Sequence, residues 1–125
     1  MDKQKEEILD YFGKCVIEEV YDAALYSAGR TVDYTTKNKI DLKHYSEFKT
    51  LSDKQREKVH ELLKETTVDI IYRFLEMIEE HDEEFKIIVE KDNVTYSLTD
   101  ISEKMGSEMA AVDDEEGWIK KFSKI

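Results

Sequence analysis

The feature that most constrains the fold is a long helical period in the middle of the chain. From residue 52 to about residue 80, apolar side chains recur at intervals of three and four residues, which is the spacing of one helix face. These side chains are Val59, Leu62, Leu63, Ile70, Phe74, Met77 and Ile78. Ser52 and Gln55 have the spacing of a capping box, which satisfies free backbone amides where a helix begins. The sequence therefore predicts one long helix that starts just after Ser52.

A second long helix is predicted for residues 2–28. One face of it carries the apolar side chains Leu9, Phe12, Val16, Val20 and Ala24. Gly29 is placed to end this helix in a left-handed conformation, and Gly13 marks a point where a kink is expected. Residues 30–50 are predicted to be a loop with one short helix. Its apolar face would carry Leu42, Tyr45 and Phe48.

The spacing of the apolar residues changes after the long helix predicted for residues 52–80. The segments FKIIVE (residues 85–90) and VTYSL (residues 94–98) are rich in β-branched and aromatic side chains, and KDN between them favours a turn. These segments predict a β-hairpin. Thr99 or Asp100 is then expected to cap a short helix that carries Ile101 and Met105. A last short helix, starting at Asp113 or Asp114, would carry Trp118, Ile119 and Phe122.

The predicted fold is therefore mainly α, of the α+β class. It has two long amphipathic helices with a β-hairpin and short C-terminal helices. The chain has 125 residues, the usual size of one domain. It has no proline and only four glycines, so no stretch of it resembles an interdomain linker. Residues 1–125 are expected to form a single domain.

The sequence also indicates a compartment. Cys15 is the only cysteine, so it cannot form an internal disulfide, and this fits a reducing environment. The N-terminus has no apolar stretch of signal-peptide length, and no apolar run approaches the ~20 residues that span a bilayer. We therefore expect a cytoplasmic protein with no membrane partner.

Negative charge is concentrated in the second half of the chain. The formal net charge is -11. Residues 31–64 hold six acids and eight bases, whereas residues 65–125 hold seventeen acids and seven bases. Such a surface repels nucleic-acid phosphates and anionic lipid, and it accelerates encounter with a basic protein. Solubility alone is the competing explanation of the acidity.

Two acidic runs are the candidate binding residues. Trp118, the sole tryptophan, directly follows the second run and Gly117. Tryptophan is enriched among residues that dominate binding energy, and surrounding acids would steer a basic partner toward it. The alternative is that Trp118 anchors the last helix on the core. The candidate partner-binding residues are Glu79, Glu80, Asp82, Glu83, Glu84, Asp113, Asp114, Glu115, Glu116 and Trp118.

Motifs of catalysis are missing from the sequence. It has no nucleophile elbow, no phosphate-binding glycine loop, no Cys-x-x-Cys pair and no His-Glu-x-x-His motif. Glu57 and His60 have the Glu-x-x-His spacing of di-iron bundles, but those sites require a second such motif, which the chain lacks. No catalytic residue, metal ligand or cofactor is therefore predicted. A metal-dependent enzyme that uses His60 and nearby carboxylates is kept as an alternative.

The size, the acidity and the helix-rich plan resemble the small immunity proteins of bacterial toxin systems. Residues 51–125, which end in EEGWIKKFSKI, are similar to an uncharacterised family of this kind from low-GC bacteria. The resemblance implies a stoichiometric inhibitor whose acids cover the basic site of a toxin, often a nuclease. It rests on no diagnostic motif and carries over no functional residue.

These observations predict a non-enzymatic protein-binding module, most concretely an immunity- or antitoxin-type inhibitor that covers a basic partner with its acidic C-terminal half. The second hypothesis is a homodimeric structural or regulatory adaptor. Its basis is the pair of long amphipathic helices together with a hairpin whose edge could pair with another chain.

Overall fold

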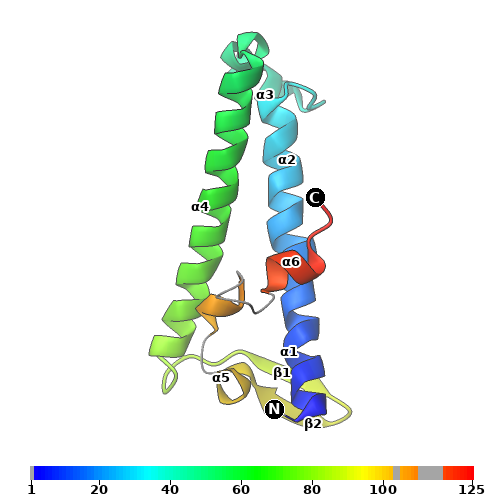
Figure 1. Ribbon diagram of the computed structural model, residues 1–125, viewed down its shortest axis with the longest axis vertical. Helices are drawn as coiled ribbons and strands as arrows, with labels where there is room; N and C mark the ends of the chain where they lie inside the picture. Colours follow the sequence, from blue (N-terminus) through cyan, green and yellow to red (C-terminus); the bar gives the residue numbers. More distant parts are fainter. Residues whose placement is uncertain (1, 103–104, 110–116) are drawn as a thin grey trace.

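The chain folds into two long antiparallel helical arms, with a two-stranded hairpin at one end (Figure 1). The computed structural model describes residues 2–102, 105–109 and 117–125. It confirms the predicted fold class, mainly α with a small β element. We use "tip" for the end where the two arms connect, and "base" for the opposite end, which carries the hairpin (Figure 1).

The first arm is one continuous helix built from three segments. These are α1 (Lys3–Val16), the π-helical turn η1 (Ile17–Asp22) and α2 (Ala23–Val32). The Asp2 side chain caps its start by accepting a hydrogen bond from the backbone N–H of Gln4 at 2.8 Å.

The π-helical turn shifts which side chains of the first arm are buried. A π-helix fits more residues into a turn than an α-helix, so the face that follows it moves by about one residue. Tyr21 and Leu25 are buried, whereas Val20 and Ala24 are exposed. The prediction that Val20 and Ala24 continue the buried stripe was therefore wrong.

The first arm also ends later than predicted. The helix runs through Gly29, and no described glycine has a positive φ. Tyr34 takes the left-handed position instead, with φ 57°, and the N–H groups of Thr35 and Thr36 bond to the carbonyl of Arg30. This conformation is strained for a side chain as large as tyrosine. The Tyr34 hydroxyl holds it by donating to the Leu42 carbonyl at 2.6 Å.

The tip consists of two short helical pieces, α3 (Lys39–His44) and the 3₁₀ turn η2 (Ser46–Thr50). Asn38 caps α3 by accepting hydrogen bonds from the N–H groups of Ile40 and Asp41. The single short helix predicted for this segment is therefore split in two at Tyr45.

The second arm is α4 (Asp53–Glu80), and its predicted capping box is confirmed. The Ser52 N–H donates to Gln55 Oε1 at 2.8 Å, and the Gln55 N–H donates to Ser52 Oγ at 3.1 Å. The predicted buried face was only partly correct. Its buried side chains are Ile71, Leu75 and Ile78, whereas Leu62, Ile70, Phe74 and Met77 are exposed. Helix α4 carries apolar residues on two faces, and only one of them is covered, by α2 toward the tip and by η3 toward the base.

The base carries the predicted hairpin, formed by β1 (Ile88–Lys91) and β2 (Val94–Ser97). Val89 pairs with Tyr96 across it. Asp92 and Asn93 both have positive φ, as a two-residue type I′ turn requires. The hairpin prediction is confirmed, although β1 begins at Ile88 rather than at residue 85.

Three short elements follow the hairpin: the first lies at the base, the second packs on α4, and the third packs on the first arm (Figure 1). They are α5 (Leu98–Ile101), η3 (Gly106–Met109) and α6 (Trp118–Phe122). Helix α5 starts directly from the hairpin without the predicted side-chain cap, and Met105 lies beyond its end. Helix α6 follows Gly117, so the predicted start at Asp113 or Asp114 lies outside the described residues. The buried core is made by Ile8, Leu9, Ile17, Tyr21, Leu25, Ile71, Leu75, Leu98, Ile101, Met105 and Trp118.

Trp118 and Gly13 pack closely against each other in this core. A Cβ atom on Gly13 would lie 2.5 Å from the Trp118 indole, so only glycine allows the ring to lie on the helix. Phe12 meets the same ring edge-to-face, with centroids 5.9 Å apart. Gly13 therefore serves close approach, whereas we had expected it to mark a kink.

We predict that Gly13→Ala destabilises the protein by about 1–3 kcal/mol, because the added methyl forces Trp118 out of place. The measurement is urea unfolding followed by circular dichroism. Gly29→Ala is the control, since its Cβ would come no closer than 3.4 Å to His60. That helical substitution should be neutral or stabilise by about 0.5–1 kcal/mol. Equal losses in both variants would contradict the packing argument.

Candidate functional site

The first predicted acidic run lies at the base, where α4 ends. The helix stops at Glu80, and the N–H groups of Glu84 and Phe85 bond back to the His81 carbonyl. Glu79 and Asp82 are half-buried, whereas Glu80, Glu83 and Glu84 are exposed. We call these five residues the acidic end of α4.

The members of the acidic end differ in what they contact. Asp82 accepts a hydrogen bond from the Thr99 hydroxyl at 2.5 Å, and it therefore ties the turn after α4 to α5. Glu84 lies 3.3 Å from Nδ1 of His81. Glu80 and Glu83 form no ion pair with any residue that the structure describes. Two carboxylates are thus left facing solvent.

The pKa of the Glu79 carboxyl is raised above its ordinary value. Burial is the main cause, and the nearby charges of Glu76 and Glu80 add to it. A hydrogen bond from the backbone N–H of Met105 acts in the opposite direction. Glu79 therefore contacts the η3 segment at an electrostatic cost.

The charge distribution at the C-terminal end of α4 opposes the helix dipole. Acids are favourable at a helix N-terminus and bases at its C-terminus. The first turn of α4 holds the favourable acid Asp53, but its last turn holds no base and ends in Glu79 and Glu80. Helix stability therefore does not explain this arrangement.

The structure does not bring the predicted tryptophan to this surface. Trp118 is fully buried against Gly13 and Phe12, so the interpretation of it as an exposed partner-binding anchor was wrong. The alternative that it anchors the last helix on the core was correct. Four other predicted binding residues lie outside the described residues: Asp113, Asp114, Glu115 and Glu116.

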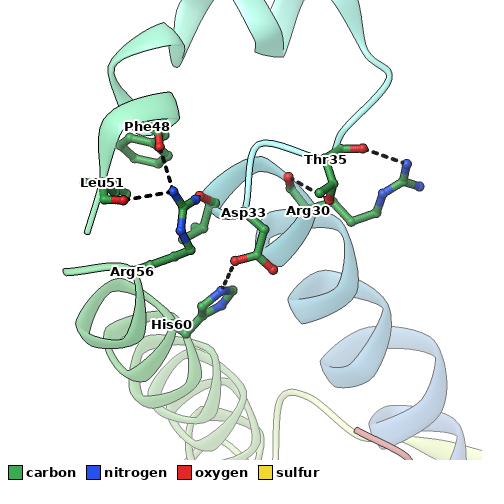
Figure 2. A network of polar contacts seen from close by, with 8 residues as sticks. Arg30, Asp33, Thr35, Phe48, Leu51, Arg56 and His60 are labelled. Carbon is green, nitrogen blue, oxygen red and sulfur yellow. Dashed lines mark hydrogen bonds and ion pairs between the residues drawn. The ribbon is translucent and has the colours of Figure 1, made fainter. Parts of the chain in front are cut away.

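A polar clamp at the tip was not predicted (Figure 2). The Arg56 guanidinium donates to the carbonyl of Val32 at the end of α2. It also donates to the carbonyls of Phe48 and Leu51, each at 3.2 Å (Figure 2). Arg56 therefore fastens three chain segments to α4. The sequence held no local signal for it, because its acceptors are backbone atoms up to 24 residues away.

His60 belongs to the same region of the tip. Its Nε2 lies 2.7 Å from Oδ1 of Asp33, and the two side chains face each other in Figure 2. Its carboxylate partner is thus Asp33 rather than Glu57, the residue of the Glu-x-x-His spacing. Within the described residues, no group of three or more His, Cys, Asp or Glu side chains is placed to hold a metal.

A groove of about 460 Å³ lies between α2, α4 and the tip. Asp41 brings a carboxylate to its wall, and the rest of the wall is mainly apolar. The sequence signal for it was the second apolar face of α4, which we had assigned to the core. The groove is lined by Ala24, Ser27, Ala28, Thr31, Val32, Asp41, Tyr45, Phe48, Val59 and Leu63.

Comparisons with protein-family models, with curated proteins and with solved structures found no match. None of the helices in the described part of the chain has the length and apolar character that crossing a membrane requires. The function is therefore inferred from the residues of this chain alone.

We predict that Arg56→Gln destabilises the protein by about 1–3 kcal/mol, since partly buried carbonyls of the tip lose their donor. Urea unfolding measures the loss. Arg73→Gln is the matched control, because the ion pair of Arg73 with Asp69 is exposed and should contribute less than about 0.5 kcal/mol. A loss that is no larger for Arg56 than for Arg73 would show that the clamp does not hold the tip.

We predict that Glu79→Gln stabilises the protein at neutral pH, by up to about 1 kcal/mol after allowance for solvent screening. The folded-state pKa of Glu79 is raised, so the native state favours the protonated form, and stability falls as pH rises through that pKa. The amide oxygen of Gln can still accept the Met105 N–H. Unfolding should therefore differ between the two proteins at pH 7 and converge well below the ordinary carboxyl pKa of 4.5. A difference that does not change with pH would contradict this cause.

Proposed function

We propose that the protein is a non-enzymatic, cytoplasmic binding module that engages a basic protein partner through the acidic end of α4. An immunity- or antitoxin-type inhibitor of a toxin is the most concrete form of this proposal. In that form the protein binds its partner stoichiometrically, and its carboxylates cover cationic residues that the toxin needs for its own substrate.

The observation that carries the proposal is the pair of exposed carboxylates of Glu80 and Glu83. They form no ion pair with a described residue, and they lie where the α4 dipole makes negative charge unfavourable. A basic partner would relieve that cost as well as add attraction of its own. Solubility alone requires acids on the surface, but it does not require them at this end of a helix.

Within the acidic end, the residues take different roles. Asp82 and Glu79 are fixed by contacts with α5 and η3, so they form a rigid base for the site. Glu80, Glu83 and Glu84 project from it as exposed charges. Rigid placement lowers the entropy that a partner must overcome when it binds.

The test is a tagged pull-down from the native host at two salt concentrations, with the product of the adjacent gene co-expressed as a candidate partner. Against the partner found, the double variant Glu80→Lys and Glu83→Lys should bind at least about tenfold more weakly, since it reverses both charges. The matched control is Glu57→Lys with Glu65→Lys, which makes the same charge change at exposed positions elsewhere on α4.

Binding should also weaken as salt screens the charges. Equal losses in both double variants would show that only net charge matters. If no basic protein binds in a charge-dependent manner even at low salt, the proposal fails.

A further inference from the structure

The groove between α2, α4 and the tip has the size of a small-molecule site. Its volume of about 460 Å³ lies within the range of about 300–1,000 Å³ in which proteins bind small molecules. The space exists because α2 presents mostly small side chains to it. These are Ala24, Ser27, Ala28 and Thr31, which recur at the three- and four-residue spacing of one helix face.

The wall of the groove at the tip has a different chemistry. It is formed by Asp41 of α3, by Tyr45 directly after α3 and by Phe48 of η2. Asp41 and Tyr45 are four residues apart, so they lie on one side of α3. Lys39 and Lys43 line a separate hollow on another side of the same helix. The groove therefore receives the one carboxylate of α3 but neither of these lysines.

The Asp41 carboxylate is half-buried and has no partner in the part of the chain that the structure describes. It accepts no hydrogen bond and forms no ion pair there. A carboxylate beside apolar walls is incompletely hydrated, and a cation that reaches it forms a charge-assisted hydrogen bond. Asp41 thus gives the groove a preference for positive charge.

Two aromatic rings share the wall with this carboxylate. The ring centroids of Tyr45 and Phe48 are 5.4 Å apart, and the ring planes are tilted by 39°. The faces of aromatic rings attract ammonium groups, and a carboxylate pairs with them. The other end of the groove, about 10 Å along α2 from Thr31 to Ala24, offers mainly apolar contact. The groove therefore has a cation-binding end and an apolar end.

We propose that the groove binds a small organic ammonium ion with an apolar body. The ammonium group pairs with the Asp41 carboxylate and lies against the rings of Tyr45 and Phe48. The apolar body extends between α2 and α4, where it packs on Ala24 and Leu63. A neutral molecule of the same shape lacks the charge that Asp41 favours.

The Arg56 clamp holds this site in place before a ligand binds. The Arg56 guanidinium donates to the carbonyls of Val32 and Phe48, and both residues line the groove (Figure 2). The Tyr34 hydroxyl donates to the Leu42 carbonyl and so fixes α3. A site whose wall is already fixed requires less ordering when the ligand binds.

The ligand site does not depend on the basic partner proposed above. The groove lies toward the tip, whereas the acidic end of α4 lies at the base. Helix α4 extends for about 25 Å between Leu63 and Glu80, at about 1.5 Å per residue. Asp41 is not part of the acidic end, so a variant at this position tests the ligand site alone. Loss of ligand binding with retained partner binding would separate the two proposals, and so would the reverse.

The test is an NMR titration of the full, isotope-labelled chain with hexylammonium chloride, and with hexanol as a neutral molecule of similar shape. Hexylammonium is expected to bind saturably and to shift the amide signals of residues that line the groove. Hexanol should bind at least about tenfold more weakly, because it lacks the charge that pairs with Asp41. Equal affinity for both probes would overturn the proposal, and so would shifts that spread over the acidic surface without saturation.

Asp41→Asn should weaken hexylammonium binding about tenfold and leave hexanol binding unchanged. The variant is expected to keep its fold, since the carboxylate has no hydrogen bond or ion pair in the described part of the chain, and its amide spectrum checks this. Glu47→Gln is the matched control, because it removes one negative charge from an exposed position of the tip outside the groove. Equal losses in both variants would show that the amine responds only to overall charge, and the site would be wrong.

Ala28→Leu tests the site by its volume. The larger side chain occupies part of the space between α2 and α4, so hexylammonium and hexanol should both bind at least about tenfold more weakly. Ala23→Leu makes the same change at an exposed position of α2 outside the groove, and it should bind both probes as the unchanged protein does. Undiminished binding to Ala28→Leu would place the ligand elsewhere and overturn the proposal.

Discussion

The contact between Trp118 and Gly13 determines how the two arms can stand apart at the base. The arms touch each other directly through α2 and α4, whereas nearer the base α1 packs on α5 and α6, and α4 packs on η3. The space between the arms there must be filled by something other than the arms. Trp118 fills this space with a large apolar ring. Because Gly13 has no side chain, the ring can lie directly on the helix backbone. The positions of η3 and α6, and so the covered face of the molecule, depend on that contact.

The tip is organised by polar groups instead. Arg56 gathers carbonyls from the end of α2 and from the segment before α4, and His60 meets Asp33 beside them. The two ends thus keep the arms paired by different means, one by apolar packing and one by hydrogen bonds. Between them lies an apolar side of α4, with Ile70 and Phe74, that neither end covers.

The helices and strands could be predicted well from the sequence, because each is encoded by a pattern of neighbouring residues. The capping box of Ser52 and Gln55, the period of α4 and the hairpin turn at Asp92 and Asn93 are all set by residues close together in the chain. The faces were harder to predict. A helix with two apolar faces does not show by its period which one is covered, and a π-helical turn shifts the pattern without a recognisable residue type. Val20 and Phe74 were therefore wrongly placed in the core.

The candidate site shows the same division. The acidic end of α4 could be located from the sequence, because its acids are close together in the chain and the end of the helix was predicted from the spacing of its apolar residues. The choice between the two interpretations of Trp118 could not be made from the sequence, since the residue on which it packs, Gly13, lies more than a hundred residues earlier. The groove and the Arg56 clamp likewise join segments that are distant in the chain.

The π-helical turn also bears on how the two arms can change in length during evolution. Such a turn behaves as a single-residue insertion, absorbed locally, so the buried faces before and after it stay aligned. Losing one residue within η1 would give a plain α-helix with Ile17 and Tyr21 still directed at the core. The same loss in the middle of α4 would rotate all that follows by about 100° and turn its buried side chains away. The first arm therefore accommodates a one-residue change in length that the second arm does not.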